Sequence, residues 1–147
     1  MIQRVSRADV SVAGSEIAAI GRGMMVLVGV ENGDTQDDAD WLAAKTVALR
    51  IFDDDNGVMN RSILDAGGNV LAISQFTLTA STRKGNRPSY IRAARGEVSE
   101  PLYDYYCDRV AGLLGRHIAK GRFGADMQVS LVNDGPVTIM IDSRLRE

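Results

Sequence analysis

The longest apolar run of this sequence covers residues 24–30 and strongly limits what the chain can fold into. A run of this length predicts a buried strand, and it falls far short of the ~20 apolar residues that a membrane span needs. The 147 residues are 45% hydrophobic and 24% charged, which is ordinary for a globular protein. We therefore expect one domain spanning residues 1–147. The first residues alternate like a strand and form no charged and apolar leader, so a cytoplasmic location is expected.

One segment after the buried run has the signals of a helix. Thr35 is a favourable cap, and acidic residues follow it in the first turn, so the sequence predicts a helix over residues 36–50. Trp41, Ala44, Ala48 and Ile51 recur at spacings of three and four and define its expected apolar face.

A second helix is predicted from Ser99-Glu100-Pro101 to Gly121. His117 falls on its apolar side near the end, where a structural role is favoured. Cys107 is expected to be a small buried hydrophobe. These are the only histidine and the only cysteine. A disulfide, a thiol-rich zinc site and a histidine cluster within one chain are therefore excluded, and we expect no metal and no cofactor.

Short strand-like segments fill most of the remaining chain. Turn residues separate them, including Gly21-Arg22-Gly23 and Asn133-Asp134-Gly135-Pro136. This pattern predicts the α/β class, of α+β type, with largely antiparallel sheets. The expected strands cover residues 10–12, 16–20, 24–30, 51–52, 58–60, 69–76, 127–132 and 137–141.

Charge is distributed unevenly, although the net charge is only −2. Residues 81–96 contain five basic residues and no acid, whereas residues 31–40 contain five acids and no base. Such asymmetry can direct a phosphate backbone to one face, but charge alone favours a solvated loop. The basic residues are Arg83, Lys84, Arg87, Arg92 and Arg95.

Two polar segments at expected strand ends are candidates for chemistry. The first, Ser74-Gln75-Phe76-Thr77-Leu78, has hydroxyls without an evident base, although backbone amides at a strand end can stabilise an oxyanion. In the second, residues 133–138, a glycine permits unusual backbone angles and a proline removes a ladder donor. Taken singly, each is typical of an ordinary strand end or hairpin turn.

Taken together, the two segments make the chain resemble the D-aminoacyl-tRNA deacylases over its whole length. That family has a Ser-Gln-Phe-Thr motif near the middle and an Asn-x-Gly-Pro-Val-Thr motif near the end, and both are intact here. Residues 3–8 also resemble the family's first strand. The resemblance implies three layers, formed by two sheets and a helical layer, and a homodimer with two active sites at its interface.

The resemblance also implies the reaction. The substrates are D-aminoacyl-tRNA and glycine mischarged on tRNA, and the ester to the terminal adenosine is hydrolysed. A cis bond between Gly135 and Pro136 of the partner subunit would place backbone carbonyls so that an L side chain is excluded. The implied residues are Ser74, Gln75, Phe76 and Thr77 in the catalytic segment, Gly135, Pro136 and Arg7 in the chiral filter, and Arg83, Lys84 and Arg87 against tRNA.

This reaction suits a chain without a histidine pair. An aminoacyl ester is already activated, so positioning and oxyanion stabilisation can suffice. Thr77 is either a nucleophile or a support, and the missing base favours support. Two other functions stay open, namely a non-catalytic RNA-binding module that uses the basic loop and a small esterase that uses Thr77 and His117. Against the module, Tyr90 is the only aromatic residue in that loop.

Overall fold

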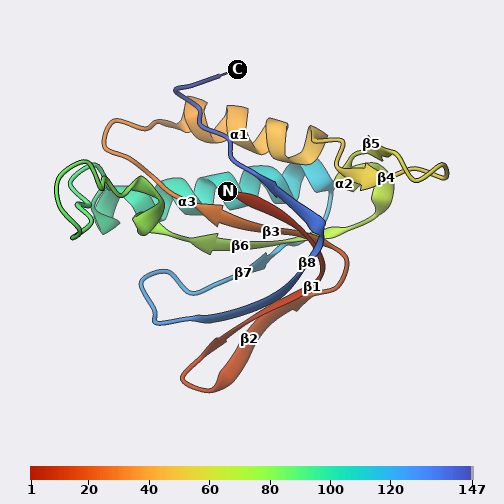
Figure 1. The fold of residues 1–147 in the computed structure, drawn as a ribbon, viewed down its shortest axis with the longest axis horizontal. Coiled ribbons are helices and arrows are strands. Elements are labelled where there is room, and N and C mark those ends of the chain that lie inside the picture. The colour runs from red at the N-terminus through yellow and green to blue at the C-terminus, as the bar shows by residue number, and fades with distance from the viewer. Residues whose placement is uncertain (147) are drawn as a thin grey trace.

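The centre of the fold is a parallel pair of buried strands. Residues 1–146 are described by a computed structural model (Figure 1). In it β3 (Gly23–Val28) pairs with β6 (Asn69–Ser74) from Gly23 opposite Asn69 to Val28 opposite Ser74. Alternate residues of both strands enter two different apolar clusters. The predicted buried strand is thus confirmed, although its strand pairing ends at Val28 rather than at residue 30.

A long kinked hairpin joins this pair to the rest of the sheet. Strand β1 (Ile2–Val12) pairs antiparallel with β2 (Ser15–Ile20) through its second half and with β3 through its first half. Because Ile20 lies opposite Ala8 and Gly23 opposite Val5, β2 and β3 run along β1 in the same direction. Residues 21–23 are therefore a bend and not the predicted reversal.

Bending at this point produces three layers. One cluster, which includes Met24 and Val70, lies between β3–β6 and the helices, and the other, with Met25 and Leu71, lies on the opposite face. Figure 1 shows the long helices on one side of β3 and β6, and the β1–β2 hairpin extending on the other. The expected three-layer α/β fold is confirmed, but its two strand layers belong to one sheet that is continuous through β1.

Helix α1 (Gln36–Ala48) begins after Thr35, as predicted. Its buried face is formed by Ala39, Ala43, Thr46 and Val47, so the predicted apolar face was wrong. Because alanine side chains are small, α1 can pack closely against the long helix of residues 96–114. The large ring of Trp41 stays half-buried, with the Arg146 guanidinium 4.8 Å from its centroid.

The second long helix, α3, covers Gly96–Leu114 rather than residues 99–121. The Ser99 amide already donates to the Arg95 carbonyl at 2.8 Å, so Ser99 lies inside the first turn. The helix ends at Gly115, whose φ of 71° is left-handed. His117 follows the helix and is exposed, so its predicted place on an apolar helix face was wrong. Cys107 is 1% exposed, as expected.

The last long strand differs most from the sequence prediction. Instead of two strands and a turn, β8 (Gln128–Ile139) is one strand paired with β1. Gln3 lies opposite Thr138 and Val5 opposite Asn133, so residues 134–137 bulge out opposite Arg4. We call residues 134–137 the bulge. The amide of Val137 donates to Asn133 Oδ1 at 3.1 Å across its base.

The remaining elements of residues 1–146 are short. The helix α2 was not predicted, although Ser62 and Asp65 form a capping box at its start. None of the described helices has the length and apolar character needed to cross a membrane. The short elements are β4 (Phe52–Asp53), β5 (Met59–Arg61), α2 (Ile63–Ala66), the 3₁₀ helix η1 (Phe76–Thr79) and β7 (Ala119–Lys120).

Candidate active site

The first motif turns sharply where β6 ends. Ser74 is the last residue of the strand, and the Gln75 amide donates to the Val28 carbonyl at 2.8 Å. The chain then enters η1, so Phe76 belongs to a 3₁₀ turn and not to the predicted strand. Gly29 permits this turn to lie close to the chain after β3, because a Cβ there would be 3.2 Å from Leu78 Cβ and 3.3 Å from the Gln75 carbonyl oxygen.

Side chains of the motif bond to one another. The Gln75 Nε2 group donates to the Thr77 hydroxyl oxygen, and the Thr79 hydroxyl donates to the Phe76 carbonyl at 2.8 Å. The Phe76 ring is 57% exposed and meets Tyr90 edge-on, with 5.1 Å between ring centroids. A carboxamide cannot accept a proton from a hydroxyl at neutral pH, so this contact gives Thr77 no general base.

The turn separates two cavities. On one side is a cavity of about 320 Å³, here called the motif cavity, which Ser74, Gln75 and Phe76 enter. Thr77 is not among its lining residues. The start of α3 and the chain before β8 close it. Its walls are formed by Val28, Val30, Ile73, Ser74, Gln75, Phe76, Ala94, Ser99, Phe123, Gly124, Ala125, Asp126, Met127 and Val129.

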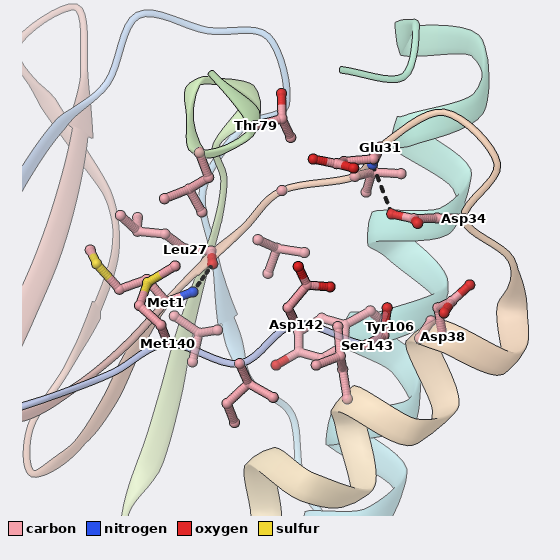
Figure 2. A pocket seen from close by; sticks show the side chains of 18 of the residues that line it. Met1, Leu27, Glu31, Asp34, Asp38, Thr79, Tyr106, Met140, Asp142 and Ser143 are labelled. Atoms are coloured by element: carbon pink, nitrogen blue, oxygen red, sulfur yellow. Dashed lines mark hydrogen bonds between the residues drawn. The ribbon is translucent and has the colours of Figure 1, made fainter. Parts of the chain in front are cut away.

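On the other side Leu78 and Thr79 reach a cavity of about 160 Å³, here called the amino-terminal cavity (Figure 2). The amino group of Met1 donates to the Leu27 carbonyl there at 2.8 Å, and burial lowers its pKa. The pKa of Asp38 is lowered mainly by the hydrogen bond from the Thr35 amide. Glu31, Asp34, Asp142 and Arg144 also line this cavity, so charged groups of both signs accompany its apolar walls.

The second motif lies elsewhere on the chain. The Gly135–Pro136 bond is cis, and Gly135 has a φ of 127°. Arg4 holds this bulge, since its Nε group donates to the Asp134 carbonyl at 2.9 Å and its Nη1 group to the Ile51 carbonyl at 2.8 Å. Gly135 and Pro136 are exposed and line neither cavity. Within one chain, the two motifs do not meet in a common cavity.

Most of the chain matches a known protein family in sequence. The family described as D-Tyr-tRNA(Tyr) deacylase matches residues 1–142. The chain belongs to this family. A D-aminoacyl-tRNA deacylase of Phocaeicola vulgatus is 58% identical over all 147 residues and 98% of its own length. One of Opitutus terrae is 59% identical with the same coverage. The deacylase family and enzyme class expected from the two motifs are thereby confirmed.

Solved structures are similar to this deacylase in fold. The c-Myc DNA unwinding element binding protein superposes with a TM-score of 0.92, at 40% identity, over 96% of this chain and 95% of that one. A probable eukaryotic D-amino acid tRNA deacylase gives a TM-score of 0.78 over 90% and 92% of the two chains. Its identity is only 16%, so it supports the fold alone.

The other predicted site residues of this deacylase are on the surface. Arg83, Lys84 and Arg87 are exposed and form no ion pair among residues 1–146. Arg7 is exposed on β1 opposite Val132. His117 lines neither cavity, and residues 1–146 contain no group of three or more His, Cys, Asp or Glu side chains placed to hold a metal.

Two arginines that contact the motifs were missed in the sequence. Arg4 is buried, and because it is two residues after buried Ile2 on the same strand, the two side chains lie on the same face of the sheet. An arginine at an inward strand position was therefore a visible signal of a buried polar role. Arg92 was grouped with the basic run, but its guanidinium donates to the Thr79 carbonyl at 3.0 and 3.1 Å. No local sequence pattern distinguishes it from its exposed neighbours.

Proposed function

We propose that this chain hydrolyses the ester of D-aminoacyl-tRNA and of glycine mischarged on tRNA, releasing the amino acid and free tRNA. The observation that carries the proposal is the first motif at the edge of the motif cavity. Its Gln75 and Thr77 side chains bond to each other, and a cavity with room for an aminoacyl group lies beside Ser74, Gln75 and Phe76. Family membership gives the reaction class, and the activated ester explains why no strong base is needed.

The chemical step is assigned to the backbone at the start of η1. A 3₁₀ turn bonds each amide to the carbonyl three residues before it, so the first two amides, of Phe76 and Thr77, have no acceptor within the turn. We assign them to the oxyanion that forms when water attacks the ester carbonyl. As the C–O bond breaks, the ribose oxygen leaves and takes up a proton. The Thr77 hydroxyl oxygen supports this arrangement by accepting a hydrogen bond from the Gln75 side-chain amide.

Chiral selection is assigned to the bulge of a second copy of the chain. Among residues 1–146, β8 pairs only with β1, so its outer edge has no strand partner. The exposed bulge is held rigid by Arg4 and belongs to no cavity of its own chain. In a homodimer it would reach the partner's motif cavity, with Arg7 bracing it. Carbonyl oxygens of Gly135 and its neighbours would then exclude an L side chain and admit glycine.

Binding of tRNA is assigned to the exposed basic loop. Arg83, Lys84 and Arg87 are free to contact the phosphates of the acceptor end, and such contacts make affinity depend on salt. The setting is the cytoplasm, where tRNA is aminoacylated.

The test of the reaction compares D-tyrosyl-tRNA, L-tyrosyl-tRNA and glycyl-tRNA with the purified chain. Release of D-tyrosine and glycine, with L-tyrosyl-tRNA left intact, is the expected result. Equal release of both tyrosine enantiomers contradicts the filter. Binding without release supports the RNA-binding module, and turnover of simple esters supports the esterase.

The dimer is tested by mixing Gln75→Ala, which removes the first motif's amide and should be inactive, with Gly135→Ala, which crowds the bulge and should release L-tyrosine as well. In a heterodimer the one intact first motif faces the intact bulge of the Gln75→Ala subunit, so unfolding and refolding an equal mixture should lower the release of L-tyrosine to about half. Unchanged release of L-tyrosine would show that both motifs act within one chain.

A further inference from the structure

Arg92 is the one member of the basic run whose guanidinium binds η1, the turn into which the first motif runs. Its Nε and Nη2 groups both donate to the Thr79 carbonyl, at 3.1 and 3.0 Å. Thr79 is the last residue of η1 and is itself only 4% exposed. Because 54% of the Arg92 side chain is exposed, this contact uses an arginine that could otherwise face solvent or a phosphate.

The backbone around Arg92 is fixed to the acidic turn after β3. The Asn32 amide donates to the Arg92 carbonyl at 2.9 Å, and the Ala94 amide donates to the Val30 carbonyl at 2.9 Å. The Asn32 side chain also donates to the Ile91 carbonyl at 3.1 Å. Arg92 therefore reaches the first motif from a segment that is itself anchored to the central strands.

Glu31 joins Arg92 to the end of the chain. Its carboxylate lies 3.6 Å from Arg92 Nε and 3.2 Å from Arg144 Nη1. Arg144 also binds Asp34 at 2.7 Å and the Asn32 carbonyl at 2.6 Å. Glu31, Asp34 and Thr79 all line the amino-terminal cavity, and Figure 2 shows the Glu31 amide donating to Asp34. Arg144, Glu31 and Arg92 thus form a continuous series of ion pairs that ends at the motif.

We propose that Arg92 is a positioning residue for deacylation, and that Glu31 and Arg144 set its orientation; this inference rests on the proposed function. Arg92 connects the two ends of the exposed loop, since it follows the loop in sequence and binds Thr79 in front of it. The backbones of Ser81 and Ser89 also bond to each other in both directions. Together these contacts keep motion of the exposed loop from displacing η1. The Phe76 and Thr77 amides then keep their positions at the start of η1, beside the motif cavity, when the loop engages tRNA.

The proposal requires the shape of the arginine side chain and not only its charge. A guanidinium offers several N–H groups in a fixed plane, so it can donate twice to one carbonyl and still face Glu31. A lysine ammonium is a single flexible centre and cannot reproduce that geometry.

The experiment compares Arg92→Lys and Arg92→Ala with Arg83→Ala, a matched change in the same loop. Single-turnover hydrolysis of D-tyrosyl-tRNA at saturating enzyme should slow about 10-fold or more in both Arg92 variants, with little change in KM. Arg83→Ala, at a residue assigned to tRNA binding, should instead raise KM. If Arg92→Lys keeps the wild-type rate, or if Arg92→Ala changes only KM, the positioning role is overturned.

A second measurement does not depend on catalysis. Amide hydrogen exchange over residues 75–80 should be about 10-fold faster in Arg92→Ala and Glu31→Gln than in the wild type, with exchange in β6 unchanged. Unaltered exchange in both variants overturns the proposal even if activity falls. A wild-type chain that releases no D-tyrosine refutes the proposed function instead, and the exchange result then decides the positioning of η1 separately.

Discussion

The bulge and the turn η1 are each held by an arginine that donates to a backbone carbonyl, but the two arginines lie in different surroundings. The Arg4 side chain is 11% exposed and binds the bulge through the Asp134 carbonyl. The Arg92 side chain is 54% exposed and binds the end of η1 through the Thr79 carbonyl. The bulge is thus fixed from inside the core, whereas the turn is held from the surface.

This difference fits the two roles proposed for these segments, selection of the substrate and hydrolysis of its ester. The proposed filter must stay rigid, and a bulge that shares its arginine with the Ile51 carbonyl can move only if the core moves. The turn η1, to which we assign the chemical step, must accept substrates with different side chains, and an arginine in contact with water can adjust at small cost. The comparison predicts large stability effects at Arg4 and small ones at Arg92 and in the basic loop.

Replacing Arg4 by alanine should have the largest effect. Two carbonyls lose charged donors, and the buried Ile51 carbonyl has no route to water, so unfolding free energy should fall by about 2–4 kcal/mol. Urea unfolding monitored by circular dichroism measures the loss. Arg7→Ala, on the exposed face of the same strand, is the control and should stay within about 0.5 kcal/mol. Equal stability of the two variants would remove the distinction between core and surface.

The loss of stability at alkaline pH should come from the core and not from either motif, because arginine does not titrate in this range. Burial raises the pKa of Cys107 to about 11 and also raises those of Tyr103 and Tyr106. A raised pKa contributes stability that is complete below the unfolded value and is lost as the pH rises through the folded one. Stability should therefore decline between about pH 9 and 11, by about 2–3 kcal/mol for Cys107 alone.

Urea unfolding at several pH values checks this, and Cys107→Ala, which lacks the thiol, should show a shallower decline. An identical decline in that variant would assign the effect to the two tyrosines alone.

Replacing Gly135 by alanine tests the rigidity of the bulge. A Cβ would lie 2.9 Å from Arg4 Nη2 and 3.0 Å from Val137 Cγ2, at a φ that L residues rarely adopt, so a loss of about 1–3 kcal/mol is expected. The preference for D- over L-tyrosyl-tRNA should fall with it. Gly14 has a φ of 80° but open space around a new Cβ atom. Gly14→Ala should therefore lower the unfolding free energy less and leave selectivity intact. A bulge that tolerates alanine without loss of selectivity is no filter.

Changes in the basic loop should affect stability least. Arg83→Glu with Lys84→Glu should shift unfolding by less than about 0.5 kcal/mol, because both side chains are exposed. KM for tRNA should rise several-fold, and its dependence on salt should weaken, since about two phosphate contacts are lost. Kinetics at two salt concentrations measure both. An unchanged salt dependence would locate the tRNA contact elsewhere.

Local patterns were sufficient for the parts of the fold that depend on neighbouring residues. The apolar run gave β3, the cap at Thr35 gave the start of α1, and both motifs were found with their residues. The start of α3 was missed because Ser99 and Pro101 resemble a first turn even when the helix has already begun. The buried face of α1 depends on what packs against it, which periodicity alone does not specify.

Long-range pairing explains the remaining errors. The glycines at residues 21 and 23 permit a reversal or a bend equally, and only the continued pairing with β1 selects the bend. The Gly135-Pro136 segment resembles a hairpin turn until Arg4, 130 residues away, is placed opposite it. The roles of Arg4 and Arg92 depend on carbonyls of distant segments, which no spacing within the sequence reveals.

Pairing of the first strand with the last also constrains the order in which the protein can be made. β1 leaves the ribosome early, but its partner β8 begins only at Gln128. Throughout most of synthesis one edge of β1 is therefore bare, and contacts this distant in sequence form slowly. A chain released before β8 keeps that open edge, and the apolar cluster around Val5 and Leu71 lacks Val129 and Leu131, which pack against it. Such a chain also lacks the bulge, so the sheet edge and the proposed filter are completed in the same step.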